Sequence, residues 1–283
     1  MSAAPHPGLG RPIPGPSALG GDFRRFLVLT WTLAITEFKL RFFGSILGYV
    51  WQLMRPLMLF GVLYVVFTQF IAVSDHPLFP VSLLLGIVLF TFFAEATGGA
   101  VSCVVDRENL VRRIHFPRMA IPLSVVLTAT FNLVLNLVVV LIFAFILGVT
   151  PHWTWFEMPV LILGLAMFST GLAMLLSALY VRFRDLRPIW EVVVQVMLYA
   201  SMIIVPFETV YEKYHTLAEL MLINPLAAIV QQSRHALVDP TIPGTAAAGG
   251  WVTLWGPVAI TVGVFFLGLW VFNREAPRVA EDL

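Results

Sequence analysis

The chain has 283 residues, of which 59% are hydrophobic and only 12% are charged, and its mean hydropathy is +0.90. Soluble domains carry about 25% charged residues, so this composition excludes a soluble globular protein and predicts a protein that crosses a membrane several times. Cys103 is the single cysteine, which excludes an internal disulfide and a cysteine-based metal site. No metal site is expected in the chain.

The N-terminal residues 1–21 are rich in Pro, Gly and Ala and contain no apolar run of the signal-peptide kind. They predict a disordered cytoplasmic tail. The next segment, 22–42, holds too many charges for a span. Six of its apolar residues form one stripe on a helical wheel: Phe23, Leu27, Trp31, Ala34, Phe38 and Phe42. Leu29, Leu33 and Leu40 lie off this stripe. We expect an amphipathic interface helix, the alternative being the less hydrophobic part of a span.

Six apolar runs reach the length of about 20 residues that a membrane helix needs. They are 46–72, 78–105, 119–149, 157–181, 188–206 and 251–272. The predicted fold is therefore an all-α membrane protein with six transmembrane helices in one domain, 22–275, followed by a short cytoplasmic tail, 276–283.

Basic residues are confined to alternate connections. The loops around Ser74–Pro77 and Thr150–Trp155 hold no Lys or Arg, whereas the other connections and both ends of the chain do. Because positively charged loops stay in the cytoplasm, both termini are expected there.

Polar residues inside the spans are candidates for function. Arg55 of the first span either faces a water-filled cavity and meets an anionic substrate or extends to the inner headgroups. Glu95 is an acid in mid-membrane, although one Glu makes a poor proton relay. It pairs with an arginine, sits near an interface or lines a polar path. Asn132 and Asn136 lie one helical turn apart, where they join helices or line a conduit.

The segment 106–118, DRENLVRRIHFPR, is a charged island between the second and third spans. It holds six formal charges, and Pro117 is expected to stop a helix before the next span. The segment 207–250 contains Asn224-Pro225 and further polar residues that would be costly in lipid. It predicts two short outer-leaflet helices, broken at Asn224-Pro225, rather than a seventh span.

The chain lacks the motifs of several enzyme classes. A P-loop needs Gly-Lys-Ser/Thr, but the only lysines, Lys39 and Lys213, follow Phe38 and Glu212. The chain therefore does not hydrolyse ATP in the P-loop manner by itself. It also lacks HExxH and the clustered acids expected of a membrane transferase, and no internal repeat suggests an ion-coupled secondary transporter.

Four motifs in order resemble the permeases of type-2 ABC exporters of the polysaccharide branch. They are RFFGSILGYVWQLMRPL at 41–57, NLVRRIHFPR at 109–118 followed by IPLS at 121–124, FRDL at 183–186, and NPL at 224–226 with Arg234. The resemblance covers about residues 22–275. It implies a half-transporter, two copies of which form a dimer with the pore between them, in the bacterial inner membrane.

The resemblance also implies two separate ATPase subunits, which would hold ATP and Mg²⁺. The interface helix and the second–third loop would contact them. The expected contact residues are Asp106, Glu108, Arg112, Arg113, Phe116 and Arg118, and the turn after the fourth span holds Arg184 and Asp185. The alternative for these arginines is that they only fix topology and touch lipid phosphates.

The cargo implied by the resemblance is a lipid-linked polysaccharide of the O-antigen, galactan or teichoic-acid type. Cations at the inner boundary suit a lipid pyrophosphate: Arg24, Arg25, Lys39, Arg41 and Arg55. The pore-lining candidates are Trp51, Tyr64, Glu95, Asn132 and Asn136. Membrane lipids are further partners, and no nucleic acid is expected. A drug or small-lipid exporter of the same fold is the alternative function.

Overall fold

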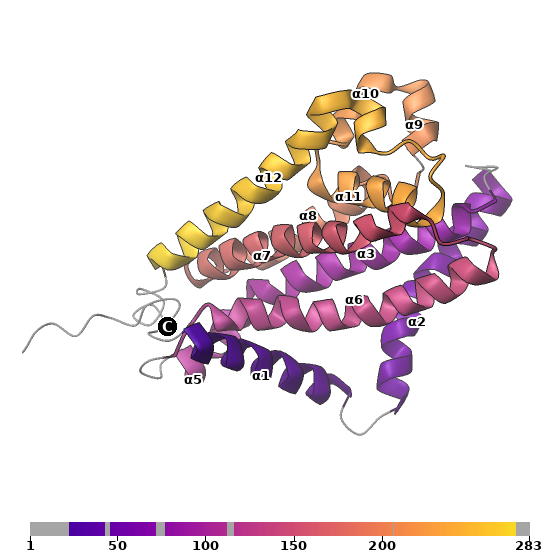
Figure 1. Ribbon diagram of the computed structural model, residues 1–283. Coiled ribbons are helices and arrows are strands. Elements are labelled where there is room, and N and C mark those ends of the chain that lie inside the picture. Colours follow the sequence, from indigo (N-terminus) through magenta and orange to yellow (C-terminus); the bar gives the residue numbers. More distant parts are fainter. Residues whose placement is uncertain (1–22, 43–45, 72–76, 112–115, 206, 276–283) are drawn as a thin grey trace, which may run out of the picture.

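The computed structural model describes residues 23–42, 46–71, 77–111, 116–205 and 207–275. Over these ranges the chain is helical with no strand, which confirms the all-α prediction. Helices α3 (Phe79–Val101), α6 (Ala120–Ile146) and α7 (Met158–Arg182) lie side by side. Helix α1 (Phe23–Phe42) packs on α6, and α12 (Thr245–Glu275) packs on α7 (Figure 1).

Helix α3 is the centre of this arrangement. It is apolar on all sides, and 78% of its apolar stretch is buried inside the protein, as expected of a helix that is surrounded by others. Helix α2 (Ile46–Val65) continues as a π-helix over Val66–Ile71. By contrast with α3, only 6% of its apolar stretch Trp51–Thr68 is buried. The apolar surface of α2 is therefore left for lipid or for another protein.

Helices α7 and α12 touch at two glycines. A Cβ on Gly171 would lie 2.7 Å from the Cα of Phe265, and a Cβ on Gly268 would overlap the carbonyl oxygen of Gly171. Small residues allow membrane helices to approach this closely. In contrast, no atom of the described residues comes within 4 Å of the Cβ position of Gly98 of α3.

Five of the six predicted spans correspond to helices that are long and apolar enough to cross a membrane. The remaining span, 188–206, which is the fifth along the chain, is occupied by α8 (Leu186–Ala200). This helix has only 15 residues and is therefore about 22 Å long. The bilayer core is about 30 Å thick. The chain leaves the helix at Ser201, and the following turn is buried, with Ile203 fully covered.

The buried guanidinium of Arg234 stabilises this turn. Its Nη2 donates to the carbonyl oxygen of Ile203 at 2.9 Å, and its Nη1 donates to Gln231 Oε1 at 3.5 Å. Non-helical backbone is tolerated at membrane depth where protein groups satisfy it. Arg234 thus allows the segment 188–206 to bend after α8, although the hydropathy of that segment favours a continuous helix.

The segment after α8 breaks at Asn224-Pro225, as the sequence predicts. The Asn224 side chain caps the following helix by accepting a hydrogen bond from the Leu226 backbone N–H at 3.1 Å. The segment forms more pieces than the two expected. They are α9 (Phe207–Lys213), α10 (His215–Met221), α11 (Pro225–Ser233) and a π-helix over Arg234–Val238.

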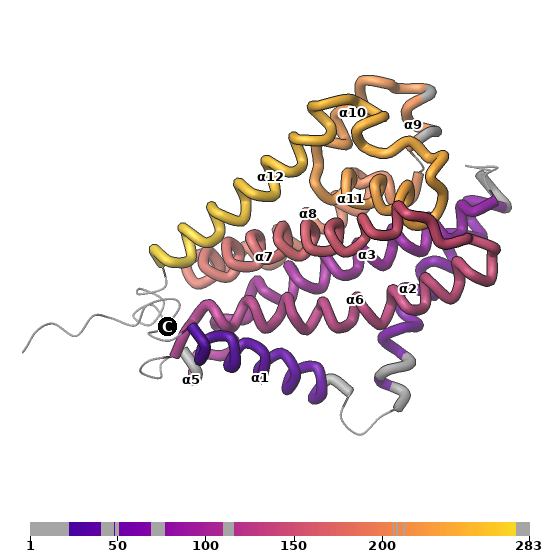
Figure 2. Tube along the Cα trace, in the orientation of Figure 1, coloured from indigo at the N-terminus to yellow at the C-terminus, as the bar shows by residue number. Residues whose placement is uncertain are grey.

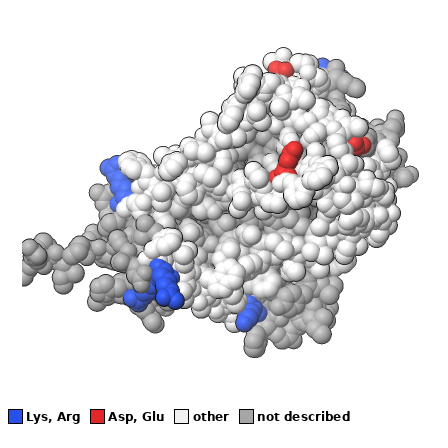
Figure 3. Space-filling model, in the orientation of Figure 1, with Lys and Arg blue, Asp and Glu red and all other residues white. Residues whose placement is uncertain are grey.

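The two ends of the helix bundle differ in character. The α3–α6 connection, with its short helix α5 (Glu108–Val111), and the end of α12 lie at the left of Figures 1 and 2, whereas α9 and α10 lie at the upper right. On the face drawn in Figure 3, most basic side chains lie at the left and lower edges, and the acidic ones lie toward the upper right together with one small basic patch. The cytoplasmic location of the basic end stays a prediction.

Candidate functional site

The α3–α6 connection begins with a break in α3. Ser102 has a φ of −95° and interrupts the helix, and the single turn α4 (Cys103–Asp106) follows. Ser102 Oγ donates to Asp106 Oδ2 at 2.8 Å, which anchors this turn. Next comes Arg107, and then α5. Ser102 and Asp106 thus join the end of α3 to the connection.

Arg107 joins three elements at this point. Its guanidinium forms an ion pair with Glu37 of α1, and its Nη1 donates to Ser124 Oγ of α6 at 3.2 Å. The same nitrogen lies 3.5 Å from the Ile121 carbonyl oxygen, which also accepts from Ser124 Oγ at 2.7 Å. Arg107 therefore ties α1, the connection and the start of α6 together.

The Glu37–Arg107 pair is largely shielded from solvent. The side chains are 23% and 20% exposed, respectively. Burial lowers the pKa of Arg107 from its usual value, but a guanidinium remains charged in proteins. In this partly buried setting the attraction is stronger than on an open surface, so the pair is suited to hold α1 in place.

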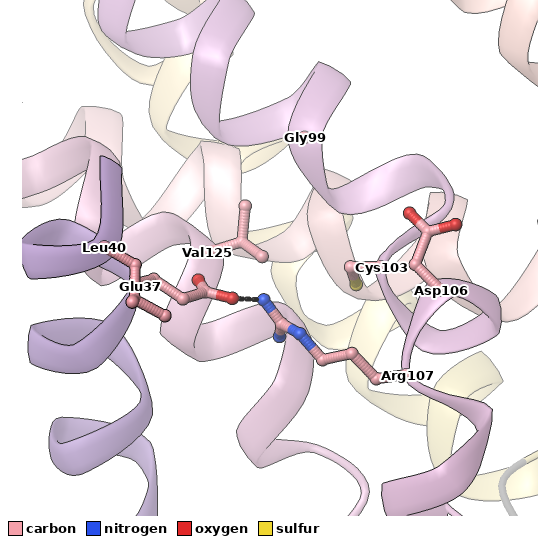
Figure 4. Close-up of a pocket in the computed structure, with 7 residues that line it drawn as sticks. All are labelled: Glu37, Leu40, Gly99, Cys103, Asp106, Arg107 and Val125. Carbon is pink, nitrogen blue, oxygen red and sulfur yellow. Dashed lines mark ion pairs between the residues drawn. The ribbon is translucent and has the colours of Figure 1, made fainter. Parts of the chain in front are cut away.

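A cavity of about 370 Å³ lies beside this pair. Figure 4 shows Glu37 and Leu40 reaching in from α1, opposite Gly99, Cys103 and Arg107, with the Asp106 carboxylate turned away from the ion pair. Burial, and secondarily the charge of Asp106, raises the pKa of the Cys103 thiol far above its usual range. The thiol is therefore protonated and unreactive.

Helix α1 has two apolar faces, which the wheel pattern did not separate. Phe26, Thr30 and Ala34 are buried against the bundle. Trp31 is 53% exposed, although its ring edge meets Phe131 of α6 at a centroid distance of 5.5 Å. The remaining stripe residues toward the start of α1, Phe23 and Leu27, are also exposed, which leaves an apolar face for the membrane.

The predicted ATPase-contact residues lie in different settings. Asp106 is exposed, Glu108 and Phe116 are half-buried, and Arg112 and Arg113 fall outside the described residues. Arg118 is only 3% exposed, and its Nε and Nη1 have no hydrogen-bond partner in the described part of the chain. Burial lowers the pKa of Arg118. The contacts themselves stay a prediction.

The predicted substrate-access cations are spread over two helices. Arg24, Arg25 and Lys39 are exposed on α1, and Arg55 is exposed on α2. The side chain of Arg41 lies outside the described residues. None of the four described cations lines the cavity beside Arg107.

The predicted pore-lining residues fall into two groups. Glu95 of α3 accepts a hydrogen bond from Asn132 Nδ2 at 2.8 Å, and Asn136 Nδ2 donates to the Asn132 carbonyl oxygen at 2.9 Å. This polar cluster joins α3 to α6. On α2, Trp51 is 59% exposed, and Tyr64 stacks on Phe60 at 5.6 Å.

The α7–α8 turn holds the remaining predicted residues. Arg184 and Asp185 are both exposed, and the Arg184 guanidinium lies over the Tyr180 ring at 5.4 Å. Beyond the turn, Arg187 pairs with Glu191 at 3.6 Å. These charges remain accessible at the same end of the bundle as the α3–α6 connection.

Glu37 and Ser124 are functional candidates that the sequence did not single out. The one signal in the sequence was that Glu37 is the only acid in α1. Nothing in the local pattern links it to Arg107, because the two residues are far apart in the chain.

Comparison with known proteins gives a consistent result. The ABC-2 type transporter family matches residues 28–238. An O-antigen export system permease protein from Myxococcus xanthus is 29% identical over 253 residues, which cover 89% of this chain and 94% of the relative. One from Klebsiella pneumoniae is 26% identical, covering 87% and 92%. A polysialic acid transport protein from Escherichia coli is 24% identical, covering 86% and 92%.

Proposed function

The chain belongs to the ABC-2 type transporter family, and on that premise we propose that it is the transmembrane subunit of an ATP-driven exporter for a lipid-linked polysaccharide of the O-antigen type in the bacterial inner membrane. The observation that carries this is its similarity to O-antigen export permeases over nearly their whole length. Because these relatives carry O-antigen in their names, we favour this glycan over a galactan or a teichoic acid.

A separate subunit supplies the energy. The chain carries no P-loop lysine, so ATP and Mg²⁺ belong to a nucleotide-binding partner. We place two copies of that partner against the basic end of the bundle. In this proposal Asp106, Glu108, Arg112, Arg113 and Phe116 meet it there.

The Glu37–Arg107 pair gives this docking surface its mechanical role. A partner that pushes on the α3–α6 connection also moves α1, because Arg107 links the connection to α1 and α6. The motion reaches α3 directly, since α4 follows α3 after a one-residue break. Glu95 and Asn132 then connect α3 to α6 deeper in the bundle.

A second copy of the chain completes the transporter. The uncovered apolar face of α2, which includes Trp51, Val62 and Tyr64, and that of α8, which includes Val192 and Tyr199, suit a contact between copies. We propose that the pore lies there. Helix α8 with the turn at Ser201–Val205 serves as the remaining crossing, the fifth along the chain, and the basic end faces the cytoplasm.

The exposed cations of α1 and α2 suit the anionic end of the cargo. Arg24, Arg25, Lys39 and Arg55 stand at the protein surface, where a lipid pyrophosphate arrives from the inner leaflet. With Arg41 they form the proposed access site.

Deletion of the gene, followed by complementation with the intact chain or with Arg55→Glu, tests the proposal. We expect the deletion strain to lack the surface glycan and to accumulate glycan inside the cell. The intact chain should restore surface glycan, and R55E should restore it only weakly. Normal surface glycan in the deletion strain would refute polysaccharide export. If resistance to small amphiphiles were lost instead, a drug or small-lipid exporter would be the function.

A further inference from the structure

A second cavity lies at the end of the bundle opposite the α3–α6 connection. It is a groove of about 440 Å³ between α7, α11 and α12. Val160 and Leu161 of α7 and Pro257 and Val258 of α12 form apolar walls. Val160 is 68% exposed and Val258 46%, so the groove opens toward the surroundings of the bundle and is not sealed inside it.

The groove exists because α7 and α12 diverge. They touch at Gly171 and Gly268, and the groove residues lie about three helical turns, or some 16 Å, further along both helices. Helix α12 is kinked at Gly249 and Gly250, where Gly250 has a φ of +67°. Figure 1 shows α12 rising away from α7 in this direction, and the surface in Figure 3 is hollowed below it.

One end of the groove is polar and negatively charged. Thr245 donates from its backbone N and its Oγ1 to Gln232 Oε1, at 3.0 and 3.1 Å. The oriented Gln232 amide then donates from Nε2 to Glu157 Oε2 at 2.7 Å. Among the described residues that line the groove there is no Lys, Arg or His, so a carboxylate is held in position with no cation in the lining.

Tryptophans place this polar end at the level of lipid headgroups. Trp153 is 87% exposed and begins the 3-10 helix Trp153–Glu157, while Trp251 on α12 is 77% exposed. Exposed Trp residues collect at the membrane–water interface. The apolar walls therefore extend from headgroup level into the hydrocarbon region.

We propose that this groove binds an aminophospholipid of the phosphatidylethanolamine class, with its amine on Glu157 and an acyl chain along Val160, Leu161 and Val258. The fixed carboxylate attracts a primary amine and repels anionic lipids, including a lipid-linked pyrophosphate, so the groove is distinct from the route of the cargo. The bound lipid bridges α7 and α12 where the direct contact between these two helices is lost.

Lipid binding is measured on the full-length chain purified into mixed micelles with equal amounts of phosphatidylethanolamine and phosphatidylglycerol. Native mass spectrometry counts the retained lipids of each class. We expect phosphatidylethanolamine to dominate, and Glu157→Gln to reduce its preference about fivefold, as loss of one partly exposed ion pair predicts. Glu219→Gln, on α10 at the same end, is the matched control and should leave the preference unchanged.

A second pair of variants tests the location. Val160→Trp should fill the groove and reduce retention of phosphatidylethanolamine, whereas Leu163→Trp, on the same helix, equally exposed and outside the groove, should not. Equal retention of the two lipids by the intact chain, or a preference that survives E157Q, would overturn the proposal. So would equal effects of V160W and L163W. Polysaccharide export is not required for any of these outcomes.

Discussion

Substitution of Glu37 by Gln tests whether the ion pair with Arg107 holds α1 on the bundle. Gln keeps the size and shape of the side chain but removes its charge. The expected result is weaker docking of α1 and a looser link between ATP hydrolysis and transport, because Arg107 then keeps only its contacts to Ser124 and Ile121.

The size of the effect follows from the exposure of the pair. Exposed ion pairs contribute about 0.2–1 kcal/mol, and breaking a fully buried pair costs about 3–5 kcal/mol. Side chains that are 20–23% exposed lie between these limits, which gives about 2 kcal/mol. At about 1.4 kcal/mol per factor of ten, this shifts the equilibrium between docked and released α1 by about 30-fold.

A double-mutant cycle measures the pair itself. E37Q, Arg107→Gln and the double variant are compared by hydrogen exchange of the α1 amides and by transport per ATP hydrolysed. The interaction energy isolates the pair from other effects of each change. Lys39→Gln, an exposed charge change on the same helix, should leave the hydrogen exchange of the α1 amides unchanged. Strictly additive effects of E37Q and R107Q would refute the assigned role of the pair.

Three further outcomes are expected. Gly268→Ala should separate α7 from α12 and lower the free energy of unfolding by about 1–3 kcal/mol. Gly263→Ala is the control on the same helix, because no atom of the described residues lies within 4 Å of its Cβ position, and it should not lower this free energy. Equal melting temperatures of the two variants would contradict the close contact. Because burial raises the pKa of the Cys103 thiol, the thiolate fraction at neutral pH is negligible. Maleimide labelling of the intact chain should therefore be slow even as the pH approaches the usual thiol pKa of about 8.5, and fast only after unfolding. Rapid labelling of the folded chain would show that the thiol is open. Asn224→Ala should cost about 1 kcal/mol through the lost cap of α11, and Asn224→Ser should restore most of it, as read from thermal unfolding; identical losses would show that the cap contributes nothing.

The sequence predicted the features that depend on local composition. Five spans follow from apolar length alone, and the break before α11 follows from the capping Asn224 and the missing N–H of Pro225. The charged segment 106–118 was placed between two spans because its neighbours on both sides are too apolar to leave the membrane.

Features that depend on tertiary contact were out of reach. The run 188–206 is apolar in its second half apart from Ser201, so its hydropathy did not reveal that the chain bends after Ala200, where Arg234 binds the Ile203 carbonyl. The pairing of Glu37 with Arg107 joins segments whose relative positions follow from how α1 packs on α6. The same holds for the glycines: only the crossing of α7 and α12 distinguishes Gly171 and Gly268 from the open Gly98.

The source of energy is the most direct test of the account. The chain is reconstituted into vesicles with its nucleotide-binding subunit, and movement of a fluorescently labelled lipid-linked glycan across the bilayer is followed. We predict transport that requires ATP and both subunits, and that stops when the P-loop lysine of the partner is replaced. Transport by this chain alone, driven by an ion gradient without ATP, would contradict the account.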